Sequence, residues 1–166
     1  MGMRERNNLI PTINSYIQHF SRNGWPILAT RDWHPPNHCS FTEQGGPHPT
    51  HCVQGSRGAQ FHSDLVMPPG MMVISKGTDS KKDAQSGFEG SSLADRLEDL
   101  EIKTVFVLGP AIQNCLKQTV VDACKIRLQV IVLKDAIGNL GDLPDTLNEI
   151  SQAGVLQATT SDLGIH

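Results

Sequence analysis

The sequence predicts an α/β fold, a three-layer α/β/α sandwich built on a mostly parallel sheet. Two observations lead to this prediction. From residue 71 onward, short apolar strands alternate with amphipathic helices, and this alternation favours parallel pairing through right-handed crossovers. The chain has 166 residues, of which 38% are hydrophobic, so it is long enough for one domain (1–166) with a core of its own.

The amino-terminal part is expected to begin with a surface helix. Apolar residues recur at helical spacing on one face from Leu9 to Phe20, and Gly24 follows as a helix stop. Residues 26–30 (PILAT) predict a short apolar strand. Residues 31–70 are rich in His, Pro, Gly and Asn without any period, and long irregular loops inside a domain usually have a function.

The rest of the chain predicts four further strands separated by helices. The expected strands are residues 71–75, 104–108, 129–133 and 155–158. The expected helices are residues 91–100, with Ser91 or Ser92 as N-cap, 113–125 and 143–153. The run 104–108 (TVFVL) is apolar throughout and is expected to be fully buried. Ligands bind beyond the carboxyl ends of such strands, so the candidate functional loops follow Thr30, Ser75 and Leu108.

Composition and charge exclude several classes of function. With 14 Lys+Arg against 17 Asp+Glu, the formal net charge is -3, which argues against nucleic acid or anionic lipid as a partner. The sequence has no apolar run long enough to span a bilayer and no export signal. The 4 cysteines form no CxxC pair, as is typical of free thiols in a reducing compartment. A cytoplasmic protein that acts on a small molecule is therefore expected.

The loop after Thr30 contains a candidate metal site. Asp32 and His34 are separated by one residue at a strand end, so both can turn toward one point, and His51 returns along the loop as a third ligand. Two imidazoles and one carboxylate suit Zn²⁺, with Fe²⁺ and Mn²⁺ as alternatives. The other interpretation is that these histidines are simply polar, solvated loop residues.

The other two loops contain a lysine and a cysteine. Lys76 directly follows a predicted strand, where a desolvated ammonium could pair with a nucleophile, although strand-end lysines also extend into water. Cys115 stands at the first turn of a predicted helix, where the helix dipole favours a thiolate and backbone N–H groups form a candidate oxyanion hole. The alternative for this cysteine is a small apolar packing role.

These segments together resemble one family. The strings ATRDWHPPNHCSF, HCVQGSRGAQFH, ISKGTD, DAQSGFEGSSL and CLKQTVVDA are similar, in order and spacing, to the nicotinamidase branch of the isochorismatase-like cysteine hydrolases. The resemblance covers most of the chain, residues 10–135. It implies hydrolysis of nicotinamide to nicotinic acid and ammonia, a step of NAD salvage.

The resemblance also implies roles for the candidate residues. Cys115 is implied to be the nucleophile and Lys76 its charged partner, with the backbone N–H groups of Ala111 and Cys115 as the oxyanion hole. The implied chemistry is thiolate attack on the amide carbon, loss of ammonia and hydrolysis of the thioester. A divalent metal, Zn²⁺ before Fe²⁺ or Mn²⁺, is implied as the cofactor. Its implied ligands are Asp32, His34 and His51, with His38 reaching the metal directly or through water.

The sequence departs from the family at two places. The family's usual first strand is missing; it carries a catalytic Asp and lies between the strands equivalent to residues 26–30 and 104–108. Its loss is expected to leave backbone groups unpaired or to bring those two strands together. The expected substrate wall consists of Trp33, His48 and Gln85, the last two replacing aromatic residues of the family and weakening the stacking on a flat ring.

The expected function is therefore nicotinamidase-like hydrolysis, impaired by loss of the catalytic Asp, because general acid-base help contributes about 10²- to 10⁴-fold. Two alternatives stay open: a non-catalytic metal- or ligand-binding relative, and a hydrolase of another small amide. The expected partner is a small-molecule amide, with no nucleic acid and no membrane, and a homo-oligomer remains open.

Overall fold

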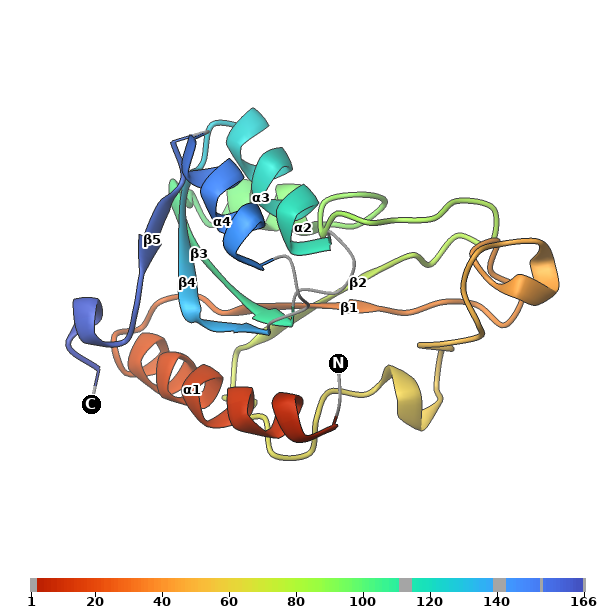
Figure 1. Ribbon diagram of the computed structural model, residues 1–166, viewed down its shortest axis with the longest axis horizontal. Coiled ribbons are helices and arrows are strands. Elements are labelled where there is room, and N and C mark those ends of the chain that lie inside the picture. Colours follow the sequence, from red (N-terminus) through yellow and green to blue (C-terminus); the bar gives the residue numbers. More distant parts are fainter. Residues whose placement is uncertain (1–2, 111–114, 139–142, 153, 166) are drawn as a thin grey trace.

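The computed structural model describes residues 3–110, 115–138, 143–152 and 154–165, in which helices lie on both sides of parallel strands (Figure 1). The helices are α1 (Met3–Arg22), α2 (Leu93–Asp99), α3 (Cys115–Lys125) and α4 (Leu143–Gln152). The strands are β1 (Leu28–Asp32), β2 (Met72–Lys76), β3 (Thr104–Pro110), β4 (Gln129–Gly138) and β5 (Leu156–Ala158). This arrangement confirms the predicted α/β fold.

The strands form two parallel sheets. β1 pairs with β2, and the second sheet has the order β3-β4-β5. No ladder joins β1 to β3 in the part of the chain that the structure describes, so each of these strands has one edge without a strand partner. The run 104–108 is accordingly half-buried throughout, and the expectation that it is fully buried is wrong. Since β3 has a neighbouring strand on one edge only, its apolar side chains are covered less completely than those of a central strand.

The side chains of β4 contact two different helical layers. Val130 and Val132 pack with α3 and α4 in one core cluster, whereas Leu133 and Ala136 pack with α1 in another. A third, smaller cluster joins Ile74 of β2 to α2. Because β4 is buried from both sides, the helices and strands form the three predicted layers. No described helix is long and apolar enough to cross a membrane.

A polar contact fixes α1 to the end of β4. The hydroxyl of Tyr16, which is completely buried, donates to Asp135 Oδ1 at 2.6 Å. The backbone N–H and the hydroxyl of Thr160 donate to the other carboxylate oxygen at 2.9 Å and 3.0 Å. Burial acts to raise the pKa of Asp135, but the hydrogen bonds from Thr160 and Tyr16 outweigh it and hold that pKa below its ordinary value. This carboxylate therefore links α1, β4 and the segment after β5.

Candidate active site

A cavity of about 240 Å³ lies where β1 and β2 end and α3 begins. Its walls come from the three loops that the sequence singled out. The lining residues are Asp32, His34, Ser40, His48, Pro49, His51, Lys76, Asp83, Ala84, Gln85 and Cys115. The structure thus brings together the predicted nucleophile, the lysine, three predicted metal ligands and two predicted wall residues around one space.

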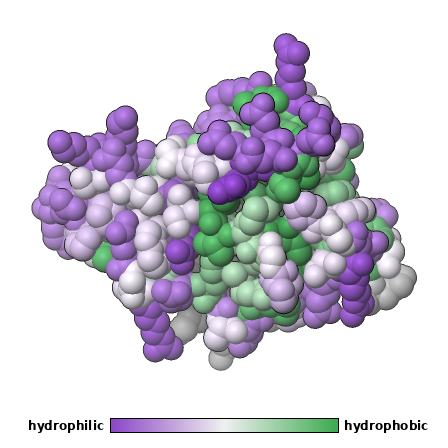
Figure 2. All heavy atoms as spheres, turned by 180° about the vertical axis from the view of Figure 1, so that it is seen from behind, coloured by the Kyte–Doolittle hydropathy of each residue, from purple (hydrophilic) through white to green (hydrophobic). Residues whose placement is uncertain are grey.

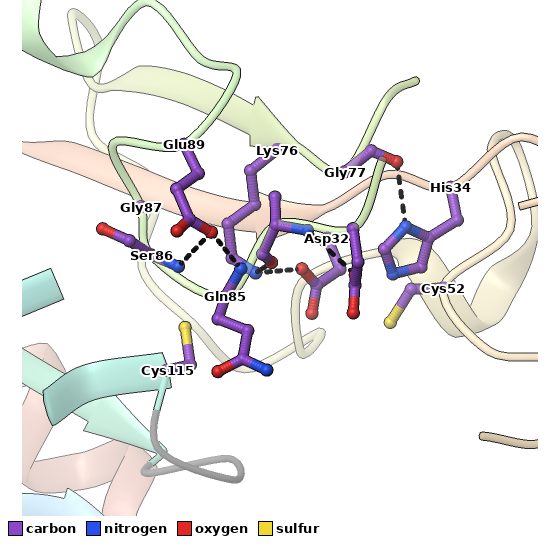
Figure 3. A network of polar contacts seen from close by, with 12 residues as sticks. Asp32, His34, Cys52, Lys76, Gly77, Gln85, Ser86, Gly87, Glu89 and Cys115 are labelled. Carbon is purple, nitrogen blue, oxygen red and sulfur yellow. Dashed lines mark hydrogen bonds and ion pairs between the residues drawn. The ribbon is translucent and has the colours of Figure 1, made fainter. Parts of the chain in front are cut away.

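Asp32 and Lys76 meet because β1 and β2 run in parallel. They are the last residues of their strands and lie opposite each other in the ladder. Lys76 Nζ lies 2.5 Å from Asp32 Oδ1 and donates to the carbonyl of Ala84 at 2.6 Å. Only 5% of Lys76 is exposed, so this ion pair is largely withdrawn from water. Figure 3 shows the Lys76–Asp32 ion pair, which lies between Cys115 and His34.

Cys115 is the first residue of α3, and its sulfur points toward the loop after β2 (Figure 3). Burial raises the pKa of the thiol and the carboxylate of Asp32 adds to this, whereas the charge of Lys76 and the hydroxyl of Thr119 lower it. The net direction is upward, so burial outweighs the cationic neighbour. Burial therefore acts against the thiolate that the helix dipole was expected to favour.

The rings of His34 and His51 are oriented by backbone carbonyls. Nδ1 of His34 lies 2.9 Å from the carbonyl of Gly77, and Nδ1 of His51 lies 2.9 Å from that of Pro49. A carbonyl only accepts hydrogen bonds, so Nδ1 donates and Nε2 keeps its lone pair, as in metal-binding histidines. The two ring centroids are 4.9 Å apart. Burial lowers the pKa of His34, which keeps this ring in the neutral form that binds metals.

Gly77 is required where His34 approaches the chain. Its φ is +62°, in the left-handed region, and a Cβ at this position would lie 2.5 Å from Cε1 of His34. Any side chain here would displace the ring or the loop. The Lys-Gly pair noted in the sequence thus combines the buried ammonium with space for an imidazole.

The residue types of Asp32, His34 and His51 fit a divalent metal, although their side chains are not yet grouped around one point. Asp32 Oδ1 is buried and makes no hydrogen bond, its near neighbour being the ammonium of Lys76. His34 and His51 each offer Nε2. Within the described ranges, no three His, Cys, Asp or Glu side chains are grouped so that they could hold an ion as they stand. The residue types therefore suit Zn²⁺, while the carboxylate is engaged by Lys76.

His38 is positioned differently from its expected role. Its Nε2 lies 3.1 Å from the carbonyl of Lys82 and must donate, and its Nδ1 lies 2.7 Å from the hydroxyl of Ser40, which donates to it. Both nitrogens are thus engaged, and the ring, completely buried, stacks on His34 with centroids 4.1 Å apart. This ring offers no lone pair to a metal and supports the ring of His34 instead.

Trp33 does not line the cavity in the described structure. It stands between Asp32 and His34 on an extended segment, where successive side chains point to opposite sides. Its ring lies under the guanidinium of Arg31, with 3.7 Å between Cζ and the ring centroid. Ala111, the other predicted oxyanion-hole residue, lies outside the described residues.

Four lining residues were not predicted as site residues: Ser40, Pro49, Asp83 and Ala84. Asp83 adds a second carboxylate to the cavity wall, and its Oδ1 accepts a hydrogen bond from the N–H of Ala84 at 2.9 Å. The signal for it was present in the string DAQSGF, in which only Gln85 was assigned to the wall. Nothing in residue type or spacing marks Asp83 alone; its neighbour Ala84 is bound by Lys76, a contact that is not visible in the sequence.

Comparisons with known proteins agree with this geometry. The isochorismatase domain family matches residues 1–161. The nicotinamidase of Escherichia coli is 31% identical, over 98% of this chain and 88% of that protein. The structure is similar to pyrazinamidase of Pyrococcus horikoshii in complex with zinc, with a TM-score of 0.86, 40% identity and coverage of 93% of this chain and 87% of the other.

A further solved structure, PnC1 from L. infantum in complex with nicotinate, has a TM-score of 0.78 and 33% identity, and the match covers 93% of this chain and 80% of that one. The family match extends over nearly the whole chain, and the relatives are similar to it in both sequence and fold. The chain therefore belongs to the isochorismatase family and has the isochorismatase-like α/β fold, with nicotinamidases among its relatives.

Proposed function

We propose that this chain hydrolyses nicotinamide, or a closely similar small amide, to the corresponding acid and ammonia, with Cys115 as the nucleophile. The observation that supports this most directly is that one cavity holds the thiol, the Lys76–Asp32 pair and the imidazoles of His34 and His51. The similarity to nicotinamidases and to a structure with nicotinate bound supports the substrate class. A role in cytoplasmic NAD salvage is part of the proposal.

The reaction proposed at Cys115 conserves its thiol. The sulfur bonds to the amide carbon, the carbon–nitrogen bond breaks, and ammonia leaves with the thiol proton. Water then cleaves the thioester and returns a proton to sulfur. Because Cys115 opens α3, its backbone N–H is one donor for the oxyanion, and Ala111 remains the predicted second donor.

Proton transfer in this chain is proposed to be inefficient. The carboxylates that line the cavity among the described residues are Asp32 and Asp83. The carboxylate of Asp32 is engaged by the ammonium of Lys76, and Asp83 lies at the exposed end of the wall. Without a carboxylate dedicated to the thiol, we expect a rate deficit of about 10²- to 10⁴-fold relative to a complete site.

A divalent metal is proposed at Asp32, His34 and His51, with Zn²⁺ before Fe²⁺ or Mn²⁺. When bound, such an ion supplies a Lewis acid that anchors a ring nitrogen of the substrate. The protein orients the imidazoles through Gly77 and Pro49. His38 is left out of the proposed donor set because both of its nitrogens are hydrogen-bonded.

A second candidate function is hydrolysis of another small amide. The cavity walls at His48 and Gln85 are polar. The ring of His48 lies edge-on to that of His51, with 5.8 Å between the ring centroids. Such walls favour hydrogen bonding over stacking on a flat ring. A substrate with a polar group at this position would then be preferred.

The decisive experiment measures ammonia release from nicotinamide, pyrazinamide and benzamide, with Zn²⁺, with Mn²⁺ and with a chelator. Release that requires metal, disappears in Cys115→Ala and persists in the control Cys124→Ala supports the proposal. Cys124 is a suitable control because it lies at the other end of α3, against the core. Stoichiometric Zn²⁺ binding without ammonia release from any amide would refute the proposed activity. It would favour the alternative that the chain is a non-catalytic metal-binding relative.

A further inference from the structure

The hydroxyl of Thr119 joins the loop after β2 to the first turn of α3. Its Oγ1 accepts a hydrogen bond from the N–H of Gly87 at 2.8 Å and donates to the carbonyl of Cys115 at 2.8 Å. A threonine in a helix often donates to the carbonyl four residues earlier, and that contact alone would mean little. Here the same oxygen also receives a hydrogen bond from a residue 32 positions away in the chain.

Close packing fixes the position of Gly87 at this contact. A Cβ on Gly87 would lie 3.3 Å from the methyl group of Thr119, 3.3 Å from Leu93 and 3.4 Å from Thr30. A side chain at position 87 would therefore be crowded by α3, α2 and β1, so glycine suits the place where this loop meets α3. The methyl group of Thr119 thus limits what position 87 can carry, while its hydroxyl binds the loop.

The same loop is bound at its other end by the site lysine. Lys76 donates to the carbonyl of Ala84, and the carboxylate of Glu89 accepts the N–H groups of Gln85 at 2.6 Å and Ser86 at 3.2 Å. Hydrogen bonds thus run from Lys76 through this loop to Thr119 and from there to Cys115. The ammonium and the sulfur belong to different elements, and these hydrogen bonds through the loop connect them.

We propose that Thr119 is a positioning residue for Cys115: its hydroxyl holds the first turn of α3 against the loop that Lys76 anchors, and it turns from the Cys115 carbonyl to the sulfur when the thiol ionises. The proposal rests on the proposed function in so far as Cys115 is the nucleophile. A hydroxyl rotates freely about its carbon–oxygen bond, so the change of acceptor needs no movement of the backbone. The Thr119 hydroxyl is also among the groups that lower the pKa of the Cys115 thiol against the effect of burial.

The experiment compares Thr119→Val, which keeps the shape and removes the hydroxyl, with Thr119→Ser, which keeps the hydroxyl and removes the methyl group. The rate of Cys115 alkylation by iodoacetamide is followed against pH by peptide mass spectrometry. We expect the pH midpoint of the alkylation rate to rise by about one pH unit in Thr119→Val, which is the effect of losing one hydrogen bond to a charged group. Thr119→Ser is expected to stay close to the wild-type midpoint. Thr104→Val is the control, because its hydroxyl bonds Gln129 on an exposed surface.

An unchanged midpoint in Thr119→Val, or equal shifts in Thr119→Val and Thr119→Ser, would overturn the proposal and leave a packing role only. If Thr119→Val does not fold, Thr119→Ala makes the same comparison without a methyl group in place of Oγ1. Alkylation needs no substrate, so the result is independent of whether nicotinamide is hydrolysed. If ammonia release is absent while the shift is observed, the proposed function fails and the positioning role stands.

Discussion

The Gly77 backbone lies in contact with the ring of His34, and its carbonyl accepts the Nδ1 hydrogen bond of that ring at 2.9 Å. One residue therefore provides both the space for the imidazole and the acceptor that orients it. This dual role explains why glycine follows the buried lysine at the end of β2.

Substitution Gly77→Ala tests this contact. The added methyl group would lie 2.5 Å from the ring, so His34 must move away from its carbonyl. We expect Zn²⁺ affinity, measured by isothermal titration calorimetry, to fall by about 10- to 100-fold, as for lost supporting hydrogen bonds in other metal sites. Gly70→Ala is the control because Gly70 also has a positive φ, of +87°, and nothing within 4 Å of its Cβ position. Equal losses in both variants would show that backbone strain alone is responsible.

Substitution Lys76→Met tests the buried ion pair. Removing the ammonium leaves the carboxylate of Asp32 without its charged partner in a mostly buried position. We expect the free energy of unfolding in urea to fall by about 3 kcal/mol, the usual cost of leaving one charge of a buried pair alone. Lys117→Met removes an exposed partner of Glu149 and is expected to cost less than about 1 kcal/mol. Similar costs for the two lysines would mean that the Lys76 pair is solvated.

Substitution His51→Ala tests the metal proposal. His51 supplies one of three proposed donors, so its removal is expected to weaken Zn²⁺ binding by at least about 100-fold, more than loss of a supporting hydrogen bond. His62→Ala is the matched control, since His62 is an exposed loop histidine outside the cavity lining. Unchanged Zn²⁺ affinity in His51→Ala would remove this residue from the site.

Asp135 is expected to make stability depend on acid pH. Its pKa is lower in the folded protein than in the unfolded chain, so its contribution is complete above the unfolded value and is lost as pH falls toward the folded value. The free energy of unfolding is therefore expected to drop between about pH 5 and pH 3. In Asp135→Asn this drop should be smaller, and Tyr16→Phe should cost about 1 kcal/mol at neutral pH through its lost hydrogen bond. Parallel pH curves for wild type and Asp135→Asn would contradict this assignment.

Most helices and strands could be predicted because their apolar periods are regular. The predicted helix 113–125 and strand 129–133 overlap α3 and β4, and the loops after β1 and β2 were identified as functional from the positions of their strands. β4 continues to Gly138, which the pattern did not show. The charged pair Lys134 and Asp135 interrupts its apolar run, and the strand continues because Ile137 and Gly138 pair with the end of β3 after a register shift.

The candidate site shows the same limit. Strand-end positions were enough to expect Lys76 and Cys115 in one cavity, because ligands bind beyond the carboxyl ends of parallel strands; the two residues meet there although β2 and β3 belong to different sheets. The Lys76–Asp32 pair follows from the register of β1 against β2, and register is not visible in either strand alone. The family resemblance implied that His38 reaches the metal, but the hydrogen bonds that engage it depend on Ser40 and Lys82 and could not be predicted from the sequence.

The division into two sheets has a consequence for how the protein behaves in solution. Among the described residues, β1 and β3 each have one edge without a ladder, and edges of this kind are where an extended peptide can add by main-chain pairing. Main-chain pairing between two copies at these edges would respond little to salt, because backbone hydrogen bonds involve no net charge.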